Sequence, residues 1–161
     1  MPTAFRIIRD ITGEAYLAFL TAALRSQHSF LLVWQDQLDF TKAARAVSTG
    51  IANLQIRCKR TDRWPGTQIL DSRATVVIYK CHQTAFSHLA RPGSLFSWRA
   101  PDYPEDLAFF RHRGVCSLAS VSHEQEAWIL CPELRRELAE IVAVEEEKVS
   151  EDYWQAISGV Q

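Results

Sequence analysis

The chain has 161 residues, of which 47% are hydrophobic and 23% are charged, and its formal net charge is −1. These values are typical of one folded domain and indicate neither a disordered nor a membrane class, so we expect a single domain over 1–161. The longest apolar stretches, 15–24 and 30–34, fall far short of the roughly 20 residues that cross a bilayer. The start of the chain, MPTAFRIIRD, lacks the pattern of an export signal, which favours the cytoplasm.

Apolar residues at helical spacing predict an amphipathic helix over 14–27. The following stretch, SFLLVWQ, is short and rich in Phe, Val and Trp, and it predicts a buried strand over 30–34. Asp39 is placed to cap a second helix over 40–49. Apolar and polar residues then alternate over 54–59, which predicts a half-buried strand with a basic outer face.

The second half of the chain is richer in strand patterns. Pro65-Gly66 marks a turn, ATVVIYK predicts a strand over 74–80, and a short helix is expected over 83–90. Three strands separated by short turns then form an antiparallel meander: LAFFR, VCSLASV and EAWIL.

The stretch CPELRRELAEIVAVEEEKV carries Pro132 in its first turn and apolar residues on one helical face. It predicts a long amphipathic helix that covers the meander and exposes Glu145, Glu146 and Glu147. The fold class expected from these elements is therefore α+β, with an antiparallel sheet and a C-terminal meander packed against amphipathic helices.

Charge lies in two blocks of opposite sign. Residues 54–113 contain ten Lys/Arg and five Asp/Glu, a net +5, whereas residues 133–152 contain three Lys/Arg and eight Asp/Glu, a net −5. The basic block alternates with apolar residues and has no aromatic stacking motif, so nucleic-acid binding ranks lowest among the functions considered. Its candidate contacts are Arg57, Lys59, Arg60 and Arg63.

The four cysteines are widely separated and form no CxxC pair, which disfavours a zinc ribbon or a thioredoxin-type motif. We expect reduced, mostly buried thiols. Cys81, His82 and His88 carry good zinc-ligand atoms but lack the spacing of common structural sites. No Walker loop, GxGxxG or HExxH motif is present, so we predict no metal site and no cofactor.

The densest chemistry lies in 101–129, PDYPEDLAFFRHRGVCSLASVSHEQEAWI. A carboxylate pair such as Glu105 and Asp106 can divide acid and base roles, but neighbours on an extended chain face opposite sides. We therefore expect this pair to accept backbone N–H groups at a turn. His123 is the candidate base, with Asp106 or Glu124 to orient it.

Three segments of the chain, RWPGT at 63–67, LFSWRAPDYPEDLAFFR at 95–111 and SVSHEQEAWI at 120–129, resemble a pattern in small uncharacterised bacterial proteins of the polymorphic-toxin immunity type. The residues that carry the resemblance are Trp98, Pro104 to Leu107, His123 and Glu124. It implies a stoichiometric binding protein and no enzymatic role for these residues.

Two functions follow as hypotheses. The first is a binding protein that neutralises a basic toxin, which meets acidic side chains by charge complementarity. Its candidate partner-binding residues are Trp98, Glu105, Asp106, His123, Glu124, Glu145, Glu146 and Glu147. The alternative is a small hydrolase or transferase that uses His123 with Asp106 or Glu124, which requires these side chains to line one pocket.

Overall fold

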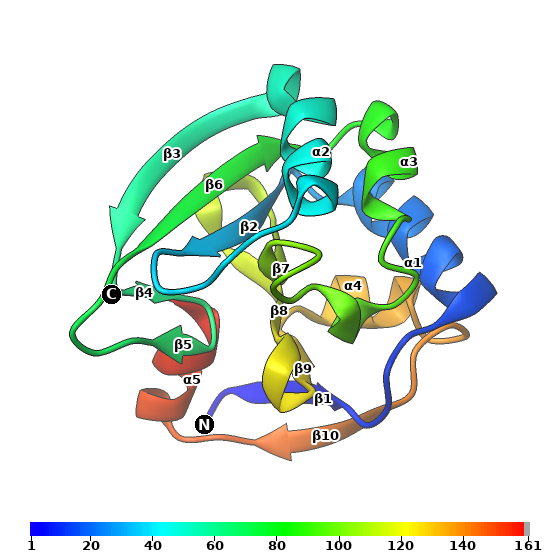
Figure 1. Ribbon diagram of the computed structural model, residues 1–161. Coiled ribbons are helices and arrows are strands. Elements are labelled where there is room, and N and C mark those ends of the chain that lie inside the picture. The colour runs from blue at the N-terminus through cyan, green and yellow to red at the C-terminus, as the bar shows by residue number, and fades with distance from the viewer. Residues whose placement is uncertain (160–161) are drawn as a thin grey trace.

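The computed structural model describes residues 1–159 (Figure 1). It is an α+β structure built on an antiparallel sheet with the strand order β10-β1-β9-β8-β7-β2-β6-β3. The strands of this sheet are β1 (Thr3–Ile7), β2 (Ser29–Gln35), β3 (Gln55–Thr61), β6 (Ala74–Lys80), β7 (Glu105–Phe110), β8 (Cys116–Val121), β9 (Glu126–Ile129) and β10 (Val144–Lys148). A separate hairpin consists of β4 (Arg63–Trp64) and β5 (Thr67–Gln68).

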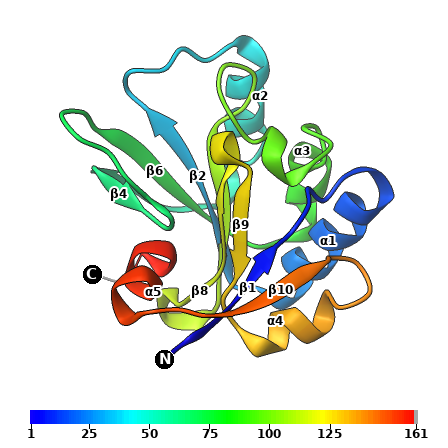
Figure 2. The same cartoon turned by 90° about the horizontal axis from the view of Figure 1, so that it is seen from below.

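Helices cover both faces of the sheet. Figure 2 shows α1 to α4 on one side, and α5 together with the β4–β5 hairpin on the other. The α-helices are α1 (Gly13–Ser26), α2 (Lys42–Gly50), α3 (Phe86–Leu89), α4 (Pro132–Glu137) and α5 (Glu151–Ser158). Short 3-10 turns are η1 (Ala52–Leu54), η2 (Gln83–Ala85), η3 (Leu95–Ser97), η4 (His112–Gly114) and η5 (Ser122–Glu124). No helix within residues 1–159 has the length and apolarity needed to cross a bilayer.

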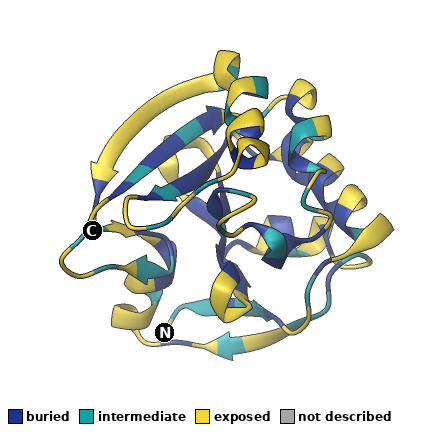
Figure 3. Cartoon of the chain, in the orientation of Figure 1, coloured by how far each residue is buried: buried dark blue, intermediate teal, exposed yellow. Residues whose placement is uncertain are grey.

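Each face of the sheet carries its own hydrophobic core. Under α1 to α4, Phe109 packs edge-on against Phe19, with ring centroids 5.8 Å apart. On the opposite face, Trp64 of the hairpin and Ile157 of α5 belong to a second apolar cluster with Trp128. Because β7 and β8 are covered on both sides, all their residues are buried (Figure 3), including the polar residues Glu105, Asp106, Ser117 and Ser120.

Local sequence patterns predicted most central elements. The expected helix over 14–27 is α1, the strand over 30–34 is β2, and the strand over 74–80 is β6. The meander is confirmed as β7, β8 and β9, which are neighbours in the sheet. All four cysteines are free thiols, as expected, but only Cys116 and Cys131 are buried, whereas Cys81 is partly buried and Cys58 is exposed.

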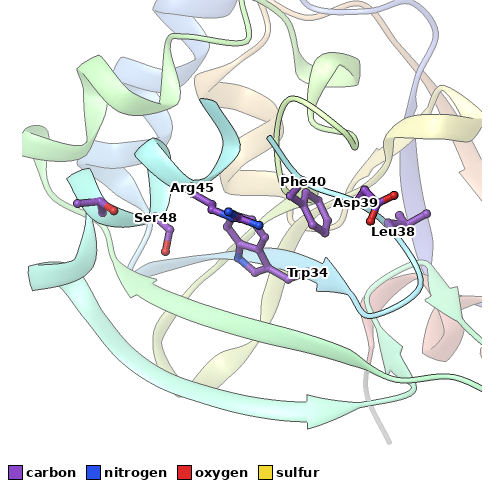
Figure 4. Close-up of a pocket in the computed structure, with 7 residues that line it drawn as sticks. Trp34, Leu38, Asp39, Phe40, Arg45 and Ser48 are labelled. Atoms are coloured by element: carbon purple, nitrogen blue, oxygen red, sulfur yellow. The ribbon is translucent and has the colours of Figure 1, made fainter. Parts of the chain in front are cut away.

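The predicted start of the second helix was wrong by two residues. Thr41, and not Asp39, is the N-cap of α2, and its hydroxyl accepts a hydrogen bond from the backbone N–H of Ala44 at 3.5 Å. Asp39 instead lines a cavity of about 430 Å³ between β2 and α2 (Figure 4). Phe40 packs edge-on against Trp34 there, with ring centroids 4.8 Å apart. This aromatic contact holds the segment that precedes α2 against β2.

Strand β3 is not half-buried, as its alternating pattern had predicted. It lies at one edge of the sheet and is exposed from Gln55 to Arg60 (Figure 3). Its apolar residue Ile56 keeps 54% of its surface exposed. Arg60 forms an ion pair with Asp36, which reduces the basic charge available on this edge. The alternating pattern predicted a strand correctly, but it could not show that the strand lies at the edge of the sheet. An edge strand has a neighbour on one side only, so less of its surface is covered.

The prediction of one long helix over CPELRRELAEIVAVEEEKV was wrong. Helix α4 ends at Glu137, and Glu145, Glu146 and Glu147 lie instead on β10, the other edge strand of the sheet. The N-terminal strand β1, which no sequence pattern had predicted, pairs antiparallel with β10. On a strand, residues two apart share a face. Arg6 of β1 accordingly pairs with Glu145 and Glu147, its Nη2 and Nε atoms lying 2.7 and 2.6 Å from their carboxylate oxygens.

The pairing of β1 with β10 separates the three glutamates by their roles. Reversing Glu145 and Glu147 to lysine should lower the urea midpoint, because Arg6 would then face two cations across the strand pair. Reversing Glu146, which is exposed and has no ion-pair partner among residues 1–159, should change stability by less than about 0.5 kcal/mol. Equal midpoints for the double and single variants would contradict this assignment.

Candidate functional site

A bulge at the start of β7 determines how its first two side chains point. Val33 of β2 pairs with Glu105, but Leu31 pairs with Ala108, so β7 contains one residue more than β2 over this interval. Asp106 has a φ of 56°, in the left-handed region that residues other than glycine seldom occupy. Bulges of this kind redirect side chains and are common beside functional sites.

The two carboxylates therefore converge and do not alternate. Glu105, Asp106 and His123 each offer one ligand atom, and these atoms lie within 4.8 Å of one another. The expectation that neighbours on an extended chain face opposite sides was wrong here, because the backbone at Asp106 is not extended. The structure thus brings His123 of η5 to the start of β7.

Asp106 is held from two directions. Trp64 Nε1 of the hairpin donates to its Oδ2 atom at 2.9 Å, and the backbone N–H of Ser122 donates to its Oδ1 atom at 2.9 Å. The carboxylate is 1% exposed, and burial raises its pKa while these two hydrogen bonds oppose the rise. Asp106 therefore fixes the β4–β5 hairpin and η5 against β7, and it accepts a backbone N–H as the sequence had led us to expect.

Glu105 is less well satisfied. Its side chain is 4% exposed, and its Oε2 atom is buried without a hydrogen-bond partner. Burial, followed by the negative charge of Asp106, raises the pKa of Glu105 to about 7, whereas the Ala100 N–H, His123 and Arg99 lower it. A buried carboxylate oxygen that no donor satisfies is costly and is uncommon in folded proteins.

Glu105 and His123 line a cavity of about 470 Å³ that we name the carboxylate–histidine pocket. Its lining residues come from β2, the β4–β5 hairpin, the segments that directly follow these two, β7 and η5. They are Gln35, Leu38, Gly66, Thr67, Gln68, Ile69, Glu105, His123 and Glu124. Asp106, which is 1% exposed, is not among these lining residues. The His123 ring is half exposed, and its Nε2 atom lies 3.7 Å from Glu124 Oε1. The Oγ1 atom of Thr67 is buried without a partner, so the pocket wall holds a second unsatisfied polar atom.

The remaining candidate residues lie elsewhere. Trp98 is fully buried, and its Nε1 atom donates to the Tyr16 hydroxyl at 2.9 Å, so it packs in the core and offers no surface to a partner. Glu105 and Asp106 are also too buried for a docking surface. Of the eight residues proposed to bind a partner, His123, Glu124, Glu145, Glu146 and Glu147 keep surface that a protein could reach.

The earlier zinc candidates do not converge. His82 caps η2, where its Nδ1 atom accepts a hydrogen bond from Thr84 N–H at 3.2 Å. Cys131 caps α4 through a contact of 3.4 Å from the Leu134 N–H to its sulfur, and burial raises the pKa of its thiol. Neither cysteine chemistry nor a Cys/His metal site is supported by these contacts.

Sequence reasoning missed two residues of the site. Trp64 precedes the Pro65-Gly66 turn and carries no signal of its own in the sequence, yet its indole N–H orients Asp106. Thr67 follows the Pro65-Gly66 turn and lines the pocket. The turn signal predicted a reversal of the chain here but contained no information on which distant strand the hairpin would cover.

No protein-family model matches the chain, and neither a curated protein nor a solved structure matches it.

Proposed function

We propose that the protein is a small hydrolase whose reaction centre is the carboxylate–histidine pocket. The observation that carries this proposal is the convergence of Glu105, Asp106 and His123 within 4.8 Å, beside a cavity that Glu105 and His123 line. Backbone strain, buried carboxylates and an accessible histidine at one cavity are typical of reaction centres. The transferase alternative would use the same residues with an acceptor other than water.

The side chains have distinct roles in this proposal. Glu105 offers its unpaired oxygen to a water molecule in the pocket, and the His123–Glu124 pair accepts the proton that this water loses as it attacks an ester carbon. The bond between this carbon and the leaving oxygen then breaks, and the same proton passes to the departing alkoxide or phenolate. Asp106 is a positioning residue, since hydrogen bonds from Trp64 and Ser122 already engage both of its oxygens.

The test is hydrolysis of a panel of p-nitrophenyl acetate, butyrate and phosphate. Removing a group that transfers protons or holds the attacking water typically costs about 100-fold in rate or more, so H123A and E105Q should each lose at least this much turnover. H112A is the matched control, because His112 is also exposed but lies in η4, outside the pocket. Turnover by H123A equal to that of the wild type, or no wild-type turnover above buffer for any ester, would sink the proposal.

A second candidate is the immunity-type binding protein that the resemblance implies. The observation that favours it is the acidic edge strand β10, on which Glu145 and Glu146 are exposed. In this function β10 and the His123–Glu124 tip would meet a basic toxin in the cytoplasm. The test is to identify the neighbouring genes and, where one encodes a toxin-like protein, to measure whether this protein rescues cells that express it; a neighbourhood without such a gene, and no protein that co-purifies, would remove this candidate. E146K should weaken rescue and slow association at low salt, because long-range charge steering is screened as salt rises. Full rescue by E146K would exclude β10 as the contact.

A further inference from the structure

We propose that Glu105, Asp106 and His123 bind a divalent transition-metal cation at the wall of the carboxylate–histidine pocket. The inference rests on the proposed function in that it supplies the same pocket with a cofactor. It replaces the sequence-based expectation that the protein has no metal site. Among residues 1–159, one group of three or more His, Cys, Asp or Glu side chains has ligand atoms close enough to share an ion, and it consists of Glu105, Asp106 and His123.

The distances are compatible with one ion. Nitrogen and carboxylate oxygen ligands lie about 2.0–2.2 Å from a cation such as Zn²⁺, so two ligands on opposite sides of it are about 4.2 Å apart. The three atoms here lie within 4.8 Å of one another, so small side-chain rotations bring them into range. His123 is half exposed on a short turn and is therefore free to make this adjustment.

The unpaired oxygen of Glu105 is an independent reason for a cation. Its Oε2 atom is buried without a donor, although its neighbour Asp106 has a donor on each oxygen. Neither carboxylate has an ion-pair partner within 4.0 Å among residues 1–159. A bound cation would satisfy the free oxygen and offset two adjacent buried negative charges, which no side chain does at close range.

The surroundings already orient the ligands. The indole N–H of Trp64 and the backbone N–H of Ser122 fix the plane of the Asp106 carboxylate, as partners beyond the metal ligands usually do. Each Asp106 oxygen keeps a further lone pair for an ion. The β7 bulge turns the Glu105 and Asp106 side chains toward the same point, so the strained backbone at Asp106 is what places two carboxylates on one ion.

The ligand set determines which cation fits. One imidazole with two carboxylates suits Mn²⁺, Fe²⁺ or Zn²⁺ better than an all-oxygen cation such as Ca²⁺. Three protein ligands leave coordination positions open toward the pocket, where a water molecule can bind, and a bound cation makes that water more acidic. With His123 on the ion, Glu124 is the remaining member of the pair that can accept the proton.

Mn²⁺ is the first probe, because Cys58 is exposed and thiolates favour softer ions such as Zn²⁺. Titration of chelator-treated protein, followed by calorimetry and by loss of the free Mn²⁺ signal in electron paramagnetic resonance, should show one bound ion per chain. E105Q and H123A should each weaken binding at least 10-fold. E105Q keeps the shape of the side chain, and H123A alters an exposed residue, so both should remain folded, which circular dichroism verifies. H112A and E146Q are matched controls and should bind as the wild type does.

The outcomes separate this inference from the proposed hydrolase. Absence of Mn²⁺ binding by the wild type, or unchanged binding by both E105Q and H123A, overturns the cation site. Ester hydrolysis that persists in chelator without bound ion removes the cation's role as a cofactor and leaves the hydrolase standing, and the cation site is then decided by the Mn²⁺ titrations alone. Binding that is lost in both variants, with no hydrolysis of any ester, supports the cation site and removes the hydrolase.

Discussion

Replacing Trp98 with alanine is expected to lower the free energy of unfolding by about 3–5 kcal/mol, the range found when large aromatic side chains are removed from cores. Trp98 is fully buried, packs edge-on against Tyr103 and donates a hydrogen bond to the Tyr16 hydroxyl, which donates in turn to the Leu89 carbonyl at 2.6 Å. The substitution removes the ring and leaves a cavity beside a buried hydroxyl. Urea denaturation at constant pH measures the loss.

Two further variants make this result specific. W98F retains most of the volume but lacks the indole N–H, so its loss should be smaller than that of W98A. W154A removes a tryptophan that is only partly buried, at the margin of the second core, and should also cost less. If W98A unfolded at the wild-type midpoint and reduced only the binding of a partner, Trp98 would have to be a surface contact and its buried position would be wrong.

The second large effect concerns pH. Burial, followed by the charge of Asp106, raises the pKa of Glu105 to about 7 from its ordinary value of 4.5. Because the pKa is higher in the folded state, the carboxyl's contribution to stability is fully present below about pH 4.5 and is lost as the pH rises through 7. At about 1.4 kcal/mol per pKa unit, the loss is on the order of 3 kcal/mol. In chelator at pH 8, E105Q should therefore be more stable than the wild type by roughly this amount.

The comparison with E105Q isolates one group among several that titrate or carry charge nearby. Asp106, His123 and Arg99 all act on Glu105 and are present in both proteins, so the difference between the two stability curves reports mainly on Glu105. The free energy of unfolding should be measured by urea denaturation from pH 4.5 to 8. Parallel curves for the two proteins over this range would show that Glu105 is not buried as a charged group in the folded state.

The candidate site was only partly predictable from sequence. Glu105, Asp106 and His123 were recognisable as reactive residue types in one short segment. Their convergence was not, because it depends on the bulge opposite β2 and on the positive φ of Asp106. That the Oε2 atom of Glu105 is buried without a hydrogen-bond partner also could not be predicted, since its burial comes from the packing of elements far apart in the chain.

The sequence by itself determined the elements whose patterns are local: helix α1, strands β2 and β6, and the β7–β8–β9 meander, whose turns are short enough to dictate which strands are neighbours. Only the tertiary structure decided the two edges of the sheet. Glu145 and Glu147 lie on a strand because β1, some 140 residues away in sequence, supplies hydrogen bonds and the Arg6 guanidinium. Helical spacing of apolar residues before β10 could not reveal that partner, since a periodic pattern records which face is buried and not which segment buries it.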